Sequence, residues 1–492
     1  MFNSNYRYKD REPWHSEEQG EVGSSILQEL KPQPLTFTPI LVPYSVRGKH
    51  IYIAGKTQQG KTTLMASIIQ QDIEHGAGVC VLDPKPSTTS KPNLVETILR
   101  HIPPTRQKDI VYFSAAAPFS LDIMSWETEE ERQTLAADLV QTFRQLSSNS
   151  SDEGTRWPGI LRFAIHTLIL AKSCSFLDIY NFLVDPPKVE SLFRTKILER
   201  IKDPKYHAYW NKSYPLFPND AAVPILNRMT QHILVDPLSI MLGANKADYS
   251  IEDIIRNRKI LLVDLTGAGK ETGNFIGTLF VSRIQQAVFR GLDVPFHLFA
   301  DEFQNFQTSA FDTILSEAGQ LGLRLTLANQ YVGQMEERIR KAIFGNVSTY
   351  FVFNIGSEDT SYFKDFMPED AMGKPMRPDA LAKLPEYNAL YAIARRKPVF
   401  KSIPVPLPPA TAEQLAFAQS VRKRTLDAYA CKMTAQSHTE VNEDPPASGR
   451  TDTPPSSGVP VSHPSPARKT GRYQPPRGAE KPEPPPSGGK KP

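Results

Sequence analysis

The hydrophobic positions along the chain fall into short runs separated by segments with helical spacing. Seven largely apolar stretches predict strands that are buried on both faces: 50–54, 78–82, 110–113, 260–264, 296–300, 323–329 and 349–354. Strands that alternate with helices are typical of an α/β fold with a mostly parallel sheet flanked by helices. Near the end, 389–394 and 399–403 flank a polar turn and predict a hairpin, and 412–430 predicts an amphipathic helix.

Residues 127–235 follow a different pattern, in which apolar side chains recur at i, i+4, i+8 and i+11. Leu135, Leu139, Phe143 and Leu146 have this spacing. Phe193, Ile197, Leu198 and Ile201 follow at i, i+4, i+5 and i+8, which also places them on one face of a helix. We therefore predict an all-α insertion domain over 127–235, between two parts of a nucleotide-binding domain, 41–126 and 236–430.

The two ends of the chain differ from this body. We predict a partly disordered N-terminal extension over 1–40 and a disordered, Pro-rich tail over 431–492. Within 441–492 lie 14 of the 43 prolines, with 8 Lys or Arg against 5 Asp or Glu, a composition that cannot bury a core. This weakly basic tail is either an inert solubilising extension or an arm that contacts a partner or DNA.

Composition restricts the function classes. The net charge is 57 − 53, or +4, so the chain is no polycation that coats nucleic acid, and any such contact must use local patches. Three distant cysteines without a CxxC pair exclude a disulfide scaffold and a thiolate zinc site. The most apolar run, 160–171, is too short to span a membrane and contains Arg162 and His166. We expect a cytoplasmic protein.

The most specific motif is GKTQQGKT at 55–62, which matches the phosphate-loop pattern GxxxxGK[ST] between a predicted strand and a helical run. Backbone amides and the helix N-terminus would surround the phosphates of ATP, Lys61 would reach the β and γ oxygens, and Thr62 would ligate Mg²⁺. Gln58 and Gln59 stand where small residues are common, so the loop must curve without a middle glycine. The predicted nucleotide-binding residues are Gly55, Lys56, Thr57, Gln58, Gln59, Gly60, Lys61, Thr62 and Thr63.

Hydrolysis also needs carboxylates, and Asp301 and Glu302 follow the strand 296–300. At the carboxyl edge of the sheet, Asp301 would hold a Mg²⁺-bound water and Glu302 would polarise the attacking water. Gln330 follows 323–329 and would contact the γ-phosphate and that water. The predicted catalytic residues are Lys61, Glu302 and Gln330, and the metal residues are Thr62 and Asp301; the alternatives are a solvated acidic turn and a polar strand cap.

Two further segments have less specific patterns. Asp83 and Lys85 follow the strand 78–82, where they either contact the nucleotide or shape a proline turn, and we favour the turn. The sequence GAGK at 267–270 lacks the four-residue gap of a phosphate loop, so we interpret it as a plain loop.

Five segments, GKTQQGKTT, VLDPKP, HLFADEFQNF, ILSEAGQLGLRLTLANQY and AIFGNVSTYFVF, together resemble the conjugative coupling ATPases of type IV secretion. These form the TraD/TraG-like branch of the HerA–FtsK P-loop group, and the resemblance covers about 45–405. It implies a RecA-like ATPase in a homo-hexameric ring that moves DNA, or a DNA–relaxase complex, toward a secretion channel. The helical block resembles the family's all-α domain, which receives substrate.

The sequence departs from this family in two ways. Many coupling proteins begin with transmembrane helices, whereas we predict none in this sequence, so we expect contact with the cytoplasmic face of the inner membrane only indirectly, through channel components and other partners. Many members carry an arginine in the segment that here reads EAGQLG, at 317–322, and Arg324 is only a weak substitute as an arginine finger.

Three functions remain open from the sequence. The first is a DNA-translocating coupling ATPase for conjugation. The second is a HerA-like DNA-processing translocase outside secretion. The third is a recruitment scaffold that binds ATP with little hydrolysis.

Overall fold

The computed structural model describes residues 49–440, apart from short gaps at 89–90, 122, 145–155, 173, 235–237, 244–247, 293, 307–310, 312, 320, 394–396 and 403–406. The predicted N-terminal extension, and the predicted tail from residue 441, lie outside the described residues. The chain forms two units, Met1–Gln436 and Ser437–Pro492. All the contacts given below belong to the first unit.

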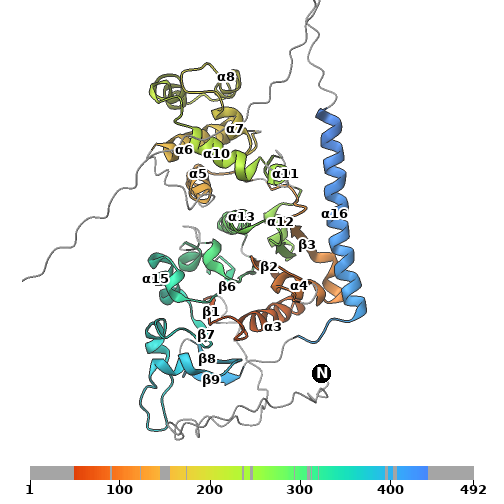
Figure 1. Cartoon of the computed structure of the whole chain (residues 1–492), viewed down its shortest axis with the longest axis vertical. Helices are drawn as coiled ribbons and strands as arrows, with labels where there is room; N and C mark the ends of the chain where they lie inside the picture. Colours follow the sequence, from red (N-terminus) through yellow and green to blue (C-terminus); the bar gives the residue numbers. More distant parts are fainter. Residues whose placement is uncertain are drawn as a thin grey trace, which may run out of the picture. The chain divides into compact units, whose positions relative to one another are not determined.

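A nine-stranded sheet forms the centre of this unit (Figure 1), with the strand order β3-β4-β2-β5-β6-β1-β7-β8-β9. The seven strands from β3 to β7 pair in parallel, and β8 and β9 add an antiparallel hairpin. The predicted mostly parallel sheet and all nine predicted strands are confirmed, with bounds that differ by at most two residues. The strands are β1 (Ile51–Ala54), β2 (Gly78–Asp83), β3 (Ile110–Ser114), β4 (Ile260–Asp264), β5 (Phe296–Ala300), β6 (Leu323–Asn329), β7 (Thr349–Val352), β8 (Asn388–Ile393) and β9 (Val399–Ser402).

Alternate residues of the inner strands enter two separate apolar clusters, as the period of two in a strand requires. In β1, Ile51 and Ile53 pack with α3 (Lys61–Glu74), α4 (Leu94–Arg100) and α16 (Ala412–Glu440). Tyr52 and Ala54 belong to the opposite cluster, which includes α13 (Lys270–Phe289). Figure 1 shows α3 and α13 on opposite sides of β2.

Every described element between residues 127 and 234 is helical. The predicted spacing corresponds to α5 and α8, although Ile201 lies beyond the end of α8 and Leu146 lies outside the described residues. The bounds of an insertion domain stay a prediction. The elements are α5 (Glu129–Arg144), α6 (Trp157–Ala171), α7 (Asp178–Leu183), α8 (Leu192–Leu198), α9 (Pro204–Ala208), η3 (Tyr209–Ser213), η4 (Tyr214–Leu216), α10 (Val223–Arg228) and η5 (Met229–Ile233).

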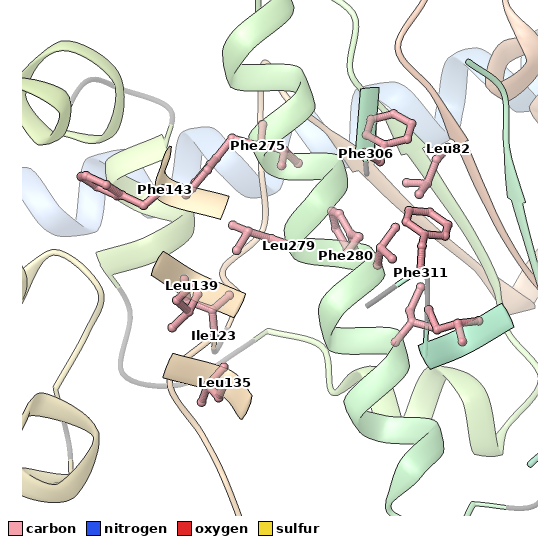
Figure 2. Close-up of a cluster of buried hydrophobic side chains, with 14 of the residues drawn as sticks. Leu82, Ile123, Leu135, Leu139, Phe143, Phe275, Leu279, Phe280, Phe306 and Phe311 are labelled. Carbon is pink, nitrogen blue, oxygen red and sulfur yellow. The ribbon is translucent and has the colours of Figure 1, made fainter. Parts of the chain in front are cut away.

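The long helix α13 joins the sheet to this helical segment. Phe275 and Leu279 point toward Phe143 and the rest of α5, whereas Phe280 points toward Phe311 on the sheet side (Figure 2). The apolar run that forms α6 is likewise largely buried, by packing with α5, α7 and α8. None of the described helices combines the length and the apolar character needed to cross a membrane.

The helix α16 is confirmed, but it continues from residue 430, where we predicted its end, to Glu440. The predicted tail therefore begins inside this helix. The first half of α16 packs against the sheet and its helices through the buried side chains of Ala418 and Val421. The guanidinium of Arg422 also pairs with Glu96 of α4 at 2.7 Å. The remaining elements are η1 (Pro104–Asp109), α11 (Leu238–Gly243), α12 (Ile251–Arg256), η6 (Phe303–Phe306), η7 (Ile314–Ala318), η8 (Val332–Gln334), α15 (Glu337–Asn346), η9 (Thr360–Phe366) and η10 (Pro378–Lys383).

Candidate nucleotide site

The strand order brings four loops together at one edge of the sheet. In this order β6 lies between β1 and β5, and β2 lies on the far side of β5. Since all four strands are parallel, the segments that follow them lie at the same carboxyl edge, which is where open α/β sheets bind ligands. Those segments contain the predicted phosphate loop, the acidic pair, Gln330 and Lys85.

The phosphate loop is anchored to the strands on both sides of β1. The backbone N–H of Gly55 donates to the carbonyl oxygen of Asn329, at the end of β6, at 3.3 Å. The N–H of Lys56 donates to the carbonyl of Asn354, just after β7, at 2.8 Å. The loop is therefore held between the two neighbours of its own strand.

Two residues of the loop have left-handed backbone conformations. Gly60, the N-cap of α3, has φ +109°, and Gln58 has φ +63°. A side chain at such an angle costs about 1–2 kcal/mol, which glycine avoids. Gln58 thus makes the curve that a middle glycine would otherwise provide. No described side chain caps α3, and its first turn contains no acidic residue, so its amides and dipole suit a bound anion.

The predicted phosphate-binding lysine lies under this loop. The ammonium of Lys61 donates to the carbonyl oxygens of Gly55 at 2.6 Å and Lys56 at 2.9 Å. Burial lowers the pKa of Lys61, although the negative charge of Asp301 opposes that change. The charged side chain is therefore close to the loop and to the acidic pair.

Thr62 and Asp301, which are 239 residues apart in the chain, meet in the structure. The Thr62 hydroxyl donates to Oδ2 of Asp301 at 3.1 Å. Asp301 is fully buried, and its backbone N–H donates to the Leu82 carbonyl of β2. Glu302 follows with φ +48°, a strained angle for a residue with a side chain. This angle turns the chain sharply after β5.

Gln330 connects the acidic pair to the phosphate loop. Its Nε2 donates to Oε1 of Glu302 at 2.7 Å, and its Oε1 lies 3.5 Å from the hydroxyl of Thr57. Gln304 donates to the other oxygen of Glu302 at 2.7 Å. Burial raises the pKa of Glu302, but these hydrogen bonds and the nearby lysines outweigh it and hold that pKa below its usual value.

Asp83 and Lys85 have different roles. The carboxylate of Asp83 accepts from the backbone N–H groups of Lys85 and Leu94, each at 2.9 Å, so it shapes the turn, as we favoured. Lys85 belongs to the same turn through its backbone N–H, but its side chain reaches further: its Nζ lies 2.6 Å from Oδ2 of Asp301 and 3.2 Å from Oε1 of Glu302. It is part of the site.

The charges of Asp83, Lys85 and Asp301 lie close enough to shift one another's pKa values. Burial and the charge of Asp301 raise the pKa of Asp83 to about 7. Burial also disfavours the charged form of Lys85, but the charges of Asp301, Asp83 and Glu302 outweigh it and raise the pKa of Lys85 above its usual value. A positive Lys85 thus compensates a cluster of buried carboxylates.

Sequence reasoning missed Tyr387, which lies on the phosphate loop. Its backbone N–H donates to the carbonyl of Gln59 at 3.2 Å, and its ring lies against Gly60. No motif surrounds this residue. Arg324, in contrast, lies at the amino end of β6, with its guanidinium 3.4 Å from Nε2 of His297. That end of the strand is remote from the phosphate loop of the same chain. GAGK, at 267–270, was predicted to be a plain loop; its first three residues follow β4 in a loop, but Lys270 is the first residue of α13.

The donor set suits a Mg²⁺ ion that is shared with phosphates. Magnesium usually takes one or two carboxylates and completes its shell with water and phosphate oxygens. Thr62 and Asp301 offer a hydroxyl and a carboxylate oxygen side by side. Among the residues that the structure describes, no group of three or more His, Cys, Asp or Glu side chains could form an all-protein cage.

Comparison with protein families matches residues 295–364 to the family described as the TraM recognition site of TraD and TraG. This stretch runs from β5 through β6, α15 and β7 into η9. It includes Asp301, Glu302 and Gln330. A comparison with curated proteins finds no match.

Solved structures of TrwB share the fold. Unbound TrwBdeltaN70, a bacterial conjugative coupling protein, is 12% identical with a TM-score of 0.52, covering 74% of this chain and 88% of that one. TrwB in complex with ADP and Mg²⁺ is 11% identical with a TM-score of 0.53, and the match covers 80% of this chain and 95% of that one. TrwB in complex with the GTP analogue GDPNP is 12% identical with a TM-score of 0.53, and the match covers 78% of this chain and 93% of that one. The predicted resemblance to the TraD/TraG-like coupling ATPases is thus confirmed, by sequence over residues 295–364 and by fold over most of the chain.

Proposed function

We propose that this chain is an ATPase that uses Mg²⁺-dependent ATP hydrolysis to deliver DNA, or a DNA–relaxase complex, to a type IV secretion channel. One observation carries the proposal: the hydrogen bonds Thr62 to Asp301 and Gln330 to Glu302 bring the phosphate loop, the acidic pair and a polar amide together at one sheet edge. These are the parts that phosphoryl transfer to water requires.

Each residue has a role in this reaction. Lys61 and the amides at the start of α3 would bind the phosphates of ATP, and Gly55, Lys56, Thr57, Gln58, Gln59, Gly60 and Thr63 complete the loop. Thr62 and Asp301 would hold Mg²⁺, which neutralises charge on the phosphate oxygens. Glu302 would orient the attacking water and accept its proton, because its lowered pKa keeps it ionised. Gln330 would keep Glu302 aligned with the loop.

The comparisons support the choice of partners. The matched family is named for TraM recognition, and TrwB is described as a conjugative coupling protein. We therefore propose DNA, relaxase and channel components as partners and a homo-hexamer as the assembly. We place the protein in the cytoplasm, attached to the inner membrane only through those partners.

Steady-state phosphate release, measured with and without single- and double-stranded DNA, tests the proposal. Lys61→Ala should abolish turnover. Glu302→Gln should still bind nucleotide but lose roughly 10²-fold to 10⁴-fold in rate, the range for a removed general base. Glu252→Gln, at a carboxylate paired with Arg290 away from the site, is the matched control and should retain activity. Normal turnover in Glu302→Gln would refute the role of that carboxylate.

The same assay, together with a binding assay for relaxase and channel components, separates the two alternatives. Absence of turnover under every condition would favour an ATP-binding recruitment scaffold. DNA-stimulated turnover in a protein that binds neither relaxase nor channel components would favour a HerA-like translocase outside secretion.

A further inference from the structure

Lys85 occupies an unusual position between the two carboxylates of the site. Its ammonium is 2.6 Å from Oδ2 of Asp301, the oxygen that also accepts the Thr62 hydroxyl, and 3.2 Å from Oε1 of Glu302. The side chain of Asp301 is 0% exposed and that of Glu302 is 7% exposed. Two buried negative charges at successive positions need a cation nearby, because an uncompensated buried charge costs several kcal/mol.

The backbone around Lys85 holds this side chain in place. Asp83 accepts from the N–H of Lys85 at 2.9 Å, and the side-chain amide of Asn93 donates to the Lys85 carbonyl at 2.9 Å. Asn93 is itself the N-cap of α4. The turn after β2 is thus tied to the start of a helix, and it presents Lys85 to the neighbouring strand β5. This is a built position rather than a chance contact of a free surface lysine.

We propose that Lys85 is a resident cation that takes the place of the divalent metal at Asp301 while the site holds no nucleotide, and that its ammonium must leave Asp301 when Mg²⁺ enters with ATP. The inference rests on the proposed function, since it takes Asp301 as a metal residue. The inference also sets the order of binding: the metal binds together with the nucleotide and not before it.

The physical reason is competition between like charges. An ammonium in contact with Asp301 repels a divalent ion a few ångströms away, and this repulsion persists where water is largely excluded. The triphosphate supplies the further negative charge that the metal needs, and it offers Lys85 new acceptor oxygens.

The test measures metal binding to the full chain without nucleotide. Mn²⁺ is titrated into the wild type, Lys85→Met and Lys85→Arg, and free Mn²⁺ is followed by electron paramagnetic resonance. Thermal unfolding in EDTA and in MgCl₂, at matched ionic strength, is the second readout. Lys259→Met is the matched control, because Lys259 is exposed to a similar degree, 33% against 34%, and pairs with Asp109 at 3.2 Å.

Lys85→Met should bind Mn²⁺ roughly tenfold or more tightly than the wild type, since a repelling charge is gone. Its melting temperature should fall in EDTA and recover with Mg²⁺. Lys85→Arg, which keeps the charge, should bind Mn²⁺ as weakly as the wild type, and Lys259→Met should show no recovery specific to Mg²⁺. Adding Asp301→Asn to Lys85→Met should remove the gained metal binding.

Equal Mn²⁺ binding by folded Lys85→Met and wild type would overturn the inference. If Lys85→Met fails to fold in EDTA, refolding with Mg²⁺ decides: recovery supports the inference, and failure in both conditions while Lys85→Arg folds overturns it. None of these measurements uses ATP. Failure of the proposed function would appear instead as a wild type without ATP turnover.

Discussion

Gly277 of α13 offers a test of how tightly the acidic pair is coupled to the core. An ideal Cβ at this position would lie 2.3 Å and 2.5 Å from Cε1 and Cδ1 of Phe306, distances that real Cβ atoms do not show. Phe306 is fully buried and belongs to η6, the turn that follows Asp301 and Glu302. Figure 2 shows its ring beside the sheet-facing side of α13. Gly277→Ala must therefore displace the Phe306 ring or α13.

The expected change in the free energy of unfolding of Gly277→Ala follows from two opposing effects. Alanine in place of glycine inside a helix stabilises by about 1 kcal/mol. Overpacking a filled core costs about 1–3 kcal/mol. Gly273, one turn earlier on α13, provides the matched control, because the nearest atoms to its added Cβ are Cβ of Leu265 at 3.8 Å and Cβ of Ala268 at 4.0 Å. Since the propensity gain is common to both variants, Gly277→Ala should be about 1–3 kcal/mol less stable than Gly273→Ala.

Urea unfolding followed by far-ultraviolet circular dichroism measures this difference, and ATP turnover is measured on the same preparations. Gly273→Ala should retain turnover, whereas Gly277→Ala should lose part of it because η6 carries the displacement back to Glu302. Equal stabilisation by both substitutions would refute the reasoning, since it would mean that Phe306 moves aside without penalty.

Two further predictions concern stability. Burial lowers the pKa of His50 to about 4 from its usual 6.5, so between these pH values the unfolded chain binds a proton that the folded chain does not. The contribution of His50 to the free energy of unfolding should therefore be full above pH 6.5 and fall by about 3 kcal/mol toward pH 4. Urea unfolding measured against pH should show this fall in the wild type and lack it in His50→Gln. The side chain of Asn93 accepts a hydrogen bond from the Glu96 N–H at 2.9 Å and so caps α4. Asn93→Ala should lower the free energy of unfolding, measured by urea, by about 1 kcal/mol, and Asn93→Asp, which retains the cap, should lower it less. Equal losses in the two variants would exclude the cap as the cause.

The strands could be predicted because the sheet is covered on both faces. A strand such as β4, in which only Asp264 is not fully buried, must be apolar almost throughout, and the run ends where the chain leaves the core. The strand order could not be predicted in this way. It depends on which helix crosses which face, and strands that are equally apolar fit several positions equally well.

The phosphate loop is a local signal, since one short segment contains the glycines, the lysine and the hydroxyl. The pairing of Thr62 with Asp301 could also be foreseen, because both segments follow parallel strands. Lys85 could not be assigned, because its role depends on β2 lying directly beside β5. Tyr387 had no sequence signal at all, since it reaches the loop through its backbone N–H and the face of its ring.

The site and the fold depend on each other through the buried charge of the acidic pair. Asp301 and Glu302 receive their partners from three other segments: Thr62 at the start of α3, Lys85 after β2 and Gln330 after β6. If any of these strand ends moved away, a charge would remain buried without its partner, at a cost comparable to a large fraction of a domain's stability. Conversely, these partners over-determine the turn at Glu302, which is why its strained φ of +48° can persist. The geometry on which the proposed hydrolysis depends is therefore the same geometry that makes the carboxyl edge of this sheet stable.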